Sequence, residues 1–295
     1  MPDDTTTMGD DPAKDGPTPV EIQIDGLCKA FGDHRVLSGI DVMVRRGEML
    51  AIVGGSGCGK TVLLNHILGR LEPDQGRVRV ADHDLEDAPL VDLADLDTVE
   101  GDRLHIHWGM VFQRNALFSG SVLDNLALWL VEVRGLGEAE VLTIAKRVLA
   151  DVDLETTEAF MATDVNELSG GMAKRLALAR ALAMDPEVLF YDEPTTGLDP
   201  TTASNIHELI ARMHVAPTRS GKARTTLIVT HDKDLLRRLQ PRTVMLHEGQ
   251  VFFDGPFADF EASDSPIIRP YFDLMPVLHG RSLDPRDLPP PGHEG

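Results

Sequence analysis

The sequence predicts an α/β fold with a parallel sheet, because three buried strands are separated by long helix-forming segments. The runs MLAIV at 49–53, EVLFY at 187–191 and TTLIVT at 225–230 are short and continuously apolar. Strands that are covered on both faces of a parallel sheet have such runs, whereas half-exposed strands alternate apolar and polar residues. Strands that alternate with helix-length segments are typical of α/β folds.

The other elements show the periods of half-buried strands and amphipathic helices. Apolar and polar residues alternate in VEIQID at 20–25 and in GIDVMVRRGEM at 39–49, which favours strands with one buried face. The segment TVMLHEGQVFFDG at 243–255 predicts a hairpin that turns at Glu248–Gly249. The segment 138–154 has its apolar residues on one helical face: Val141, Ile144, Ala145, Val148 and Leu149.

The overall composition excludes several classes of partner and compartment. The chain has 28 Lys and Arg against 48 Asp and Glu, a net charge of −20, which argues against nucleic acid as a partner. Cys28 and Cys58 cannot form a disulfide framework and are typical of a reducing compartment. No run reaches the roughly 18 apolar residues of a membrane span, and the start MPDDTTTMGDDPAKDG has no secretory pattern. We therefore expect a protein that stays in the cytoplasm.

The negative charge is concentrated in one stretch. Between Asp82 and Asp102 the chain has nine acidic residues and no Lys or Arg. Such a run is typical of a solvated face or of an exposed insertion. The alternative is a docking surface for a basic partner.

The segment GGSGCGKT, Gly54 to Thr61, has the pattern of a phosphate-binding loop. It directly follows the apolar run 49–53 and precedes a helix-forming segment, the context that such a loop requires. Glycines allow backbone N–H groups to point at phosphate oxygens, and the helix N-terminus adds a positive dipole end. We expect Lys60 to reach the β and γ phosphates and Thr61 to bind Mg²⁺. Cys58 fits this loop simply as a small residue.

Two carboxylates follow the second buried strand. Asp192 ends this strand and Glu193 comes next. Ligands of open α/β sheets bind outside the carboxyl ends of the strands, so Asp192 is predicted to hold Mg²⁺ opposite Thr61. Glu193, one residue further out, is placed to polarise an attacking water.

Three more residues are candidates because of their positions. His231 follows the third buried strand and is expected to face the γ-phosphate. Gln113 follows the apolar segment GMVF and could sense metal or water through its amide. Phe31 lies in the strand-rich N-terminal part, where it either stacks on adenine or belongs to the core.

In chain order, these residues resemble one family. The order is Phe31, GGSGCGKT, Gln113, LSGGM at 168–172, VLFYDEP at 188–194, GLD at 197–199 and His231. This order and spacing are similar to those of the ATPase subunits of ABC transporters, over about residues 20–256.

The resemblance implies a P-loop NTPase fold of the ABC ATPase type, with a RecA-like parallel-sheet core, an antiparallel β subdomain and an α-helical signature subdomain at about 114–184. The ATPase domain would span 20–256. Residues 1–19 are polar and acidic, and we expect a disordered tail there. Residues 257–295 would be a C-terminal extension. Five apolar residues of this extension share one helical face: Ile267, Ile268, Tyr271, Phe272 and Met275. The stripe packs either on its own domain or on a partner subunit.

The same resemblance implies ATP and Mg²⁺ as cofactors and assigns their contacts. Phe31 would stack on adenine, and Thr61, Gln113 and Asp192 would form the metal site. The phosphates would lie in a loop built from Gly54, Gly55, Ser56, Gly57, Cys58, Gly59, Lys60 and Thr61.

For catalysis, the resemblance implies Glu193 as the general base and His231 as a switch that contacts the γ-phosphate. Lys60 and Gln113 complete the implied catalytic set. Because none of these four positions departs from the family pattern, an inert version of the fold is not expected.

The family also implies that the site is shared between two chains. Two ATPase domains face each other head to tail, so Ser169, Gly170 and Gly171 of the signature would contact the nucleotide bound to the partner. The loop Gly197–Asp199 would contact the partner, with Asp199 close to its nucleotide. A second copy of this chain is the simplest partner.

Among ABC systems, the sequence looks most like the Mla/Mce-type ATPases of lipid transport. The pointers are Met172, where most members have Gln, and ALF at 116–118, after the glutamine. This likeness implies an integral-membrane permease, a lipid-binding Mce/Mla-type component and a peripheral position on the cytoplasmic face of the inner membrane. The acidic stretch 82–102 and the segment LALWLVEVRG at 126–135 depart from that subfamily.

Two alternatives keep the ATPase but change its role. One is a polar-solute importer, for example of amino acids. The other is a non-transport ABC ATPase, although the coiled-coil insertion or second ATPase domain of such proteins is not in this sequence. A GTPase is a weaker alternative, because the sequence has no N-K-x-D guanine-reading motif and its nearest string is HDKD at 231–234.

Overall fold

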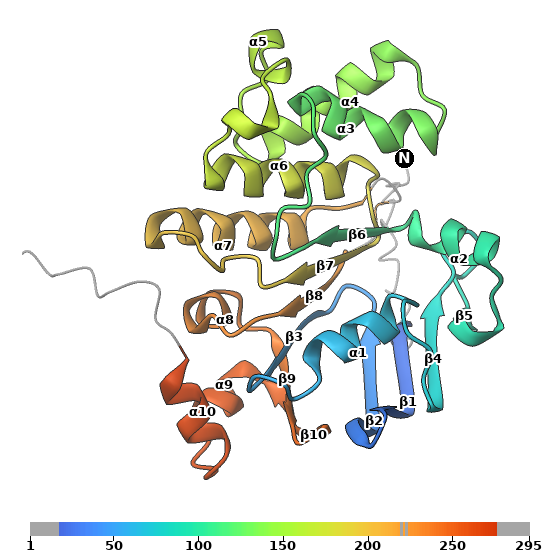
Figure 1. Cartoon of the computed structure of the whole chain (residues 1–295), viewed down its shortest axis with the longest axis vertical. Helices are drawn as coiled ribbons and strands as arrows, with labels where there is room; N and C mark the ends of the chain where they lie inside the picture. Colours follow the sequence, from blue (N-terminus) through green and yellow to red (C-terminus); the bar gives the residue numbers. More distant parts are fainter. Residues whose placement is uncertain (1–17, 219–220, 222–223, 276–295) are drawn as a thin grey trace, which may run out of the picture.

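The computed structural model describes residues 18–218, 221 and 224–275 (Figure 1). The disordered tail expected at 1–19 lies outside the described residues except for its last two positions, and so does the end of the C-terminal extension at 276–295. Two sheets occupy the middle of the molecule, a group of helices stands at one end, and the C-terminal helices lie at the opposite end (Figure 1).

A six-stranded sheet with the order β10-β9-β3-β8-β7-β6 forms the centre of the described part. Its strands are β3 (Met49–Gly54), β6 (Trp108–Val111), β7 (Val188–Asp192), β8 (Thr225–Val229), β9 (Arg242–His247) and β10 (Gln250–Pro256). All neighbours pair in parallel except β9 and β10. The three predicted buried strands are β3, β7 and β8, which lie side by side, so the predicted α/β fold with a parallel sheet is confirmed.

The central strands are apolar throughout because both of their faces are covered. In β3, Leu50 and Ile52 belong to a core cluster shared with the second sheet, whereas Ala51 and Val53 belong to a cluster shared with the C-terminal helices. Strand β7 alternates between two clusters in the same way. Side chains on both faces of these strands are therefore shielded from water, which favours apolar residues at every position.

A second sheet, of antiparallel strands in the order β2-β1-β4-β5, packs beside the first. Its strands are β1 (Val20–Phe31), β2 (His34–Arg45), β4 (Gln75–Ala81) and β5 (Leu90–Asp92). The alternation predicted for β1 and β2 is confirmed, since Ile22, Ile24, Ile40 and Val44 are at most 2% exposed. Helix α1 (Lys60–Ile67) joins the same cluster through Leu63, so it links this sheet to β3.

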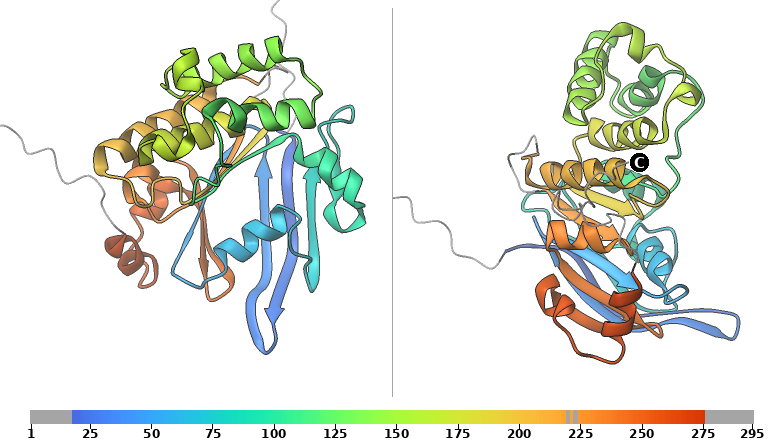
Figure 2. Two further views of the ribbon diagram at one scale, coloured as in Figure 1. Left: turned by 45° about the horizontal axis from the view of Figure 1, so that its top comes forward. Right: turned by 90° about the vertical axis from the view of Figure 1, so that its left-hand side faces the viewer.

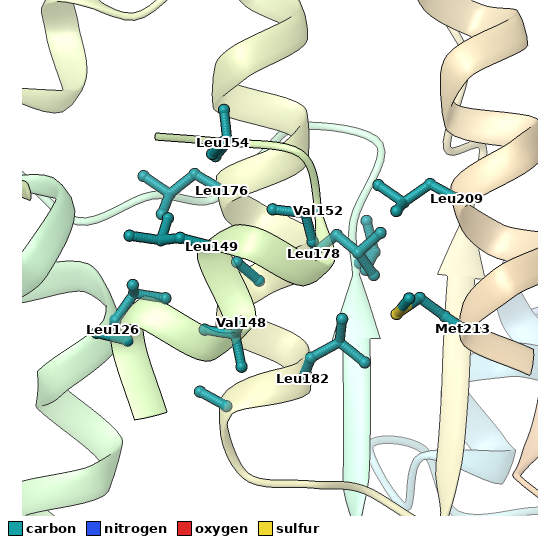
Figure 3. Close-up of a cluster of buried hydrophobic side chains, with 14 of the residues drawn as sticks. Leu126, Val148, Leu149, Val152, Leu154, Leu176, Leu178, Leu182, Leu209 and Met213 are labelled. Atoms are coloured by element: carbon teal, nitrogen blue, oxygen red, sulfur yellow. The ribbon is translucent and has the colours of Figure 1, made fainter. Parts of the chain in front are cut away.

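The helices at one end of the molecule form a group with its own core, which is most separate in the right-hand view of Figure 2. They are α3 (Val122–Glu132), α4 (Glu138–Asp151), α5 (Glu158–Met161) and α6 (Gly170–Ala183), with a short 3-10 helix η2 (Val165–Glu167) before α6. Figure 3 shows Val148 and Leu149 of α4 against Leu176 and Leu178 of α6. These helices lie within the range 114–184 expected for a helical subdomain.

Helix α7 (Pro200–Val215) connects this group to the central sheet. Its residues Leu209 and Met213 are buried in the same cluster as Leu182 of α6 (Figure 3). Ile228 of β8 belongs to the same cluster. Helix α8 (Lys233–Leu239) follows β8. In the described part of the chain, no helix is long and apolar enough to cross a membrane.

The acidic stretch 82–102 is folded, and most of its acidic residues are exposed, as expected for a solvated face. It contains β5, the short 3-10 helix η1 (Leu93–Asp95) and α2 (Thr98–His105). Asp97 forms a capping box with Glu100 at the start of α2, and buried Asp82 pairs with Arg103 at 2.7 Å. Several of its acids therefore serve helix capping and ion pairing, both of which a charge count ignores.

The hairpin predicted at 243–255 is confirmed by β9 and β10. Its two-residue turn places Glu248 at φ +49° and Gly249 at φ +74°. Positive φ at both positions is what a type I′ turn needs, and a glycine supplies one of them without strain.

The chain continues from β10 into α9 (Phe257–Glu261) and α10 (Ile268–Leu274). The apolar stripe of the extension packs on its own domain, with Ile268, Phe272 and Met275 at most 5% exposed. They share a cluster with Ala51 and Val53 of β3. Docking of the extension on a partner subunit stays a prediction.

Candidate functional site

The candidate residues meet at one edge of the central sheet. Gly54, Asp192 and Val229 end β3, β7 and β8, which are neighbouring parallel strands. The phosphate loop, the carboxylate pair and His231 therefore leave the same edge of the sheet. This is where ligands of open α/β sheets bind.

The backbone of the phosphate loop requires glycine at specific positions. Gly54 has φ +147°, and a Cβ there would lie 2.4 Å from the carbonyl oxygen of Leu246. Gly59 has φ +104°, and a Cβ there would lie 2.6 Å from a methyl carbon of Leu37. The positive φ disfavours a side chain at both positions, and at Gly54 the backbone of Leu246 also blocks one, so these glycines fix the path of the loop.

The loop has the groups that an anion needs. Within the described residues, the N–H groups of Ser56, Gly57 and Gly59 donate no hydrogen bond. The space around Gly55 and Gly57 is open, because a Cβ at either position would meet nothing within 4 Å. Helix α1 begins immediately after the loop and directs its N-terminus there. Free N–H groups at a helix N-terminus fit the phosphates of ATP.

Three side chains of the loop, Lys60, Thr61 and Cys58, have different environments. Lys60 donates hydrogen bonds from Nζ to the carbonyl oxygens of Gly54, at 2.7 Å, and Gly55, at 3.1 Å. Thr61 is exposed at the start of α1. Cys58 packs against the core cluster of the two sheets, so only its backbone is left for a phosphate.

Asp192 lies between opposing charges at the end of β7. Burial raises its pKa, and the neighbouring carboxylate of Glu193 raises it further, while Lys60 and Lys174 act in the other direction. The net shift is upward. A divalent cation would relieve this repulsion, and Mg²⁺ binds carboxylate and hydroxyl oxygens together with nucleotide phosphates. Asp192 and Thr61 supply ligands of that type.

Glu193 and His231 form a direct pair. Nδ1 of His231 lies 2.7 Å from Oε1 of Glu193, and this hydrogen bond raises the pKa of His231 above its usual value, although burial opposes it. Glu193 itself has φ +48°, and its N–H donates to the carbonyl of Val229 at 2.8 Å. Left-handed backbone at a residue other than glycine is uncommon and is often found at functional sites.

Gln113 and Phe31 are both exposed. Gln113 follows β6, and its side-chain amide makes no hydrogen bond to any described residue, so its role at the metal stays a prediction. Phe31 ends β1 and is 49% exposed, with the Lys29 ammonium 5.7 Å from its ring centroid. The alternative of a core phenylalanine is therefore wrong, and stacking on adenine stays a prediction.

The signature forms the start of α6. Ser169 caps the helix by accepting a hydrogen bond from the N–H of Met172 at 3.3 Å. A Cβ on Gly171 would lie 2.8 Å from a methyl group of Thr202, which bonds to Asp199 at the start of α7. The signature and the 197–199 loop are thus neighbours.

The signature does not join the phosphate loop of its own chain. Among residues 18–218, 221 and 224–275, no hydrogen bond or ion pair connects 169–171 to 54–61. The chain therefore has two candidate phosphate-binding elements that are not connected by such contacts.

Sequence reasoning missed three residues that shape the site. Lys174 is 3% exposed and donates to the carbonyl oxygens of Phe112 and Gln113, both at 3.0 Å, so it holds the glutamine loop against the signature helix. Asp232 accepts from Thr195 and pairs with His207 beneath the histidine loop. Tyr271, predicted only as part of an apolar stripe, contacts the phosphate loop. Of these three residues, only Lys174 could have been noticed in the sequence, because it lies among the apolar residues of a helix.

Known proteins agree with this geometry. The family model described as ABC transporter matches residues 37–196. The TRIGALACTOSYLDIACYLGLYCEROL 3 protein of Arabidopsis thaliana is 34% identical over 264 residues, 85% of this chain and 73% of that protein. The L-cystine transport ATP-binding protein TcyN of Escherichia coli is 36% identical, over 81% of this chain and 93% of that protein.

A solved structure agrees as well. The ATP-binding cassette MJ0796, a dimer in a post-hydrolysis state bound to ADP and Pi, superimposes with a TM-score of 0.66 at 30% identity. The match covers 80% of this chain and 98% of that one. The matched family model, these relatives and the edge-of-sheet geometry agree: the chain belongs to the ABC transporter family and is an ATP-binding domain that hydrolyses ATP with Mg²⁺.

Proposed function

We propose that this chain is the ATPase subunit of a transporter that moves phospholipid or another lipid between bacterial membranes. It would act as a homodimer on the cytoplasmic face of the inner membrane and drive a separate permease. The ATPase activity in this proposal is supported by one observation: the phosphate loop, Asp192, Glu193 and His231 meet at one edge of the sheet. Each residue follows a strand that holds it in place.

A surface beside the glutamine loop supports the permease contact. Phe118 is 43% exposed although its loop is firmly held. The side chain of buried Asn125 bonds both the N–H and the carbonyl of Phe118, at 2.8 and 2.9 Å. Arg180 of the signature helix lies over the Phe118 ring, 5.2 Å from its centroid. A firmly held, exposed aromatic side chain suits contact with an apolar helix from a permease.

Two observations support the lipid cargo, one from the sequence and one from a relative. Met172 and ALF at 116–118 resemble the Mla/Mce-type ATPases, and a relative is named for trigalactosyldiacylglycerol, a glycolipid. A lipid-binding component of Mce/Mla type would then deliver or receive the cargo.

The test is to purify the native complex and analyse the lipids that accompany it. The proposal predicts phospholipid enrichment over the surrounding membrane, and ATPase turnover that is low for the isolated subunit and rises in the complex. A matched preparation of the Glu193→Gln complex, which should remain in the ATP-bound state, controls for lipids that merely coat the permease. Equal lipid content in the complex and in an unrelated permease purified in parallel would contradict the lipid cargo.

The second candidate is a polar-solute importer, favoured by the 36% identity to TcyN. Such a system would respond to a substrate-binding protein loaded with an amino acid. Stimulation of turnover by such a protein, with no response to a lipid-binding component, would favour this candidate over lipid transport.

A further inference from the structure

The C-terminal helix α10 touches the phosphate loop directly. The backbone N–H of Gly54, the first residue of the loop, donates a hydrogen bond of 2.9 Å to the hydroxyl oxygen of Tyr271. The two residues are 217 positions apart in the sequence. No motif of the family resemblance accounts for this contact.

Helix α10 is held firmly enough for this contact to position the loop. Phe272, next to Tyr271, is buried beside Ala51 and Val53 of β3, the strand that leads into Gly54. The ammonium of Lys233 lies 4.4 Å from the centroid of the Phe272 ring, and Arg237 contacts the same ring. Because both cations belong to α8, which follows the His231 loop, α10 is attached to two sides of the nucleotide site.

Both backbone polar groups of Gly54 are hydrogen-bonded. Its N–H bonds to Tyr271, and its carbonyl oxygen accepts from Nζ of Lys60 at 2.7 Å. Its φ of +147° leaves no room for a side chain against Leu246. The hydrogen bond from Tyr271 therefore orients the backbone at the start of the loop. Because Lys60 bonds to the same residue, it also helps to orient Lys60, which is expected to contact the β and γ phosphates.

The hydroxyl of Tyr271 stays in one protonation state at neutral pH. Burial raises the pKa of Tyr271 to about 12, and the carboxylate of Glu193 raises it as well, while the bond from Gly54 acts in the opposite direction. The contact with Gly54 is therefore independent of pH over the range in which the enzyme would work.

We propose that Tyr271 is a positioning residue of the nucleotide site, through which α10 sets the orientation of the Gly54 peptide and the affinity of the loop for ATP. The hydroxyl does not touch the reacting atoms. Its removal should weaken nucleotide binding and leave the chemical step almost unchanged. This inference rests on the ATPase activity of the family, not on the cargo.

The experiment compares the only two tyrosines of the chain in the full-length protein. Tyr271→Phe removes the hydroxyl and keeps the ring. Tyr191→Phe removes a buried hydroxyl that has no hydrogen-bond partner among the described residues, and it serves as the matched control. We expect Tyr271→Phe to raise the Kd and the KM for Mg-ATP about two- to tenfold, the range for one lost neutral hydrogen bond. Its kcat should stay within about twofold, and Tyr191→Phe should change neither constant.

A second measurement does not depend on turnover. In nucleotide-free protein, the backbone amide of Gly54 should exchange its hydrogen faster, and shift its NMR resonance, in Tyr271→Phe but not in Tyr191→Phe. Unchanged Kd and Gly54 resonance would overturn the proposal. So would a lower melting temperature with unchanged Kd and KM, because it would reduce Tyr271 to a packing role. Failure of the wild-type chain to bind ATP would instead refute the ATPase assignment.

Discussion

Oε1 of Glu193 lies 2.7 Å from Nδ1 of His231, and the two residues follow neighbouring parallel strands. The contact places a carboxylate and a titratable ring at the point where the γ-phosphate of ATP is expected. Glu193 is held there with φ +48°, a conformation that the chain maintains at a cost in energy. The pair is the centre of the proposed chemistry.

If Glu193 is the general base, Glu193→Gln should bind ATP normally and lose turnover. We expect kcat to fall by about 10²- to 10⁴-fold, the contribution of a positioned base. The measurement is single-turnover hydrolysis together with ATP affinity. Glu248→Gln, at the exposed hairpin turn, is the control and should behave as wild type. Residual hydrolysis within tenfold of wild type would rule out the base assignment.

The pKa of His231 should depend on the same pair. The bond to Glu193 is the largest influence that raises it, so Glu193→Gln should bring it down towards the ordinary value of 6.5. An NMR titration of the His231 ring measures this. Because the pKa is raised in the folded state, the pair stabilises the protein below about pH 6.5, and this contribution is lost as pH rises through the raised pKa. It is small, since the His231 side chain is 46% exposed. An unchanged pKa in the variant would show that the pair does not exist in solution.

The hydroxyl of Tyr191 is a buried polar group that no hydrogen bond compensates. It is 1% exposed and has no hydrogen-bond partner among the described residues. An unsatisfied buried group costs about 1–3 kcal/mol, so Tyr191→Phe should leave the free energy of unfolding unchanged or raise it by about 1 kcal/mol. Urea denaturation measures the difference. A loss above about 1 kcal/mol would reveal a partner for this hydroxyl.

Met172, the residue that points to lipid cargo, packs within its own chain. Its side chain is half-buried against the core of the helical group. Met172→Gln should therefore cost about 1 kcal/mol of stability, through a polar group placed in that contact, and leave kcat within about twofold. Met184→Gln, at the other end of the same helix and against the same core, is the matched control. A tenfold loss of kcat in Met172→Gln alone would mean that the thioether contacts the partner.

The strands and loops of the site could be predicted because their causes are local. The runs of β3, β7 and β8 are apolar on both faces, and Gly54, Gly57 and Gly59 of the phosphate loop have positive φ angles, which other residues rarely adopt. The positions of Asp192 and His231 in the site could be predicted because each lies at or just after the end of a buried strand. Periodicity also predicted the buried face of α4.

The contacts that were missed depend on residues far apart in the sequence. Tyr271 resembled any other member of an apolar stripe, and only the fold brings its hydroxyl to Gly54. Lys174 bonds two backbone carbonyl oxygens, which carry no signal in a sequence. The acids of 82–102 were counted as charge, whereas Asp97 caps a helix and Asp82 pairs with Arg103.

We propose that each chain of the homodimer supplies half of two sites, because its phosphate loop and its signature serve different nucleotides. The direct measurement is ATPase activity after mixing Lys60→Ala chains with Ser169→Arg chains. In a heterodimer, the intact loop of one chain faces the intact signature of the other, so one complete site forms. We predict that activity returns on mixing, while each variant alone stays inactive. No return of activity, although heterodimers form and close on ATP, would contradict the claim.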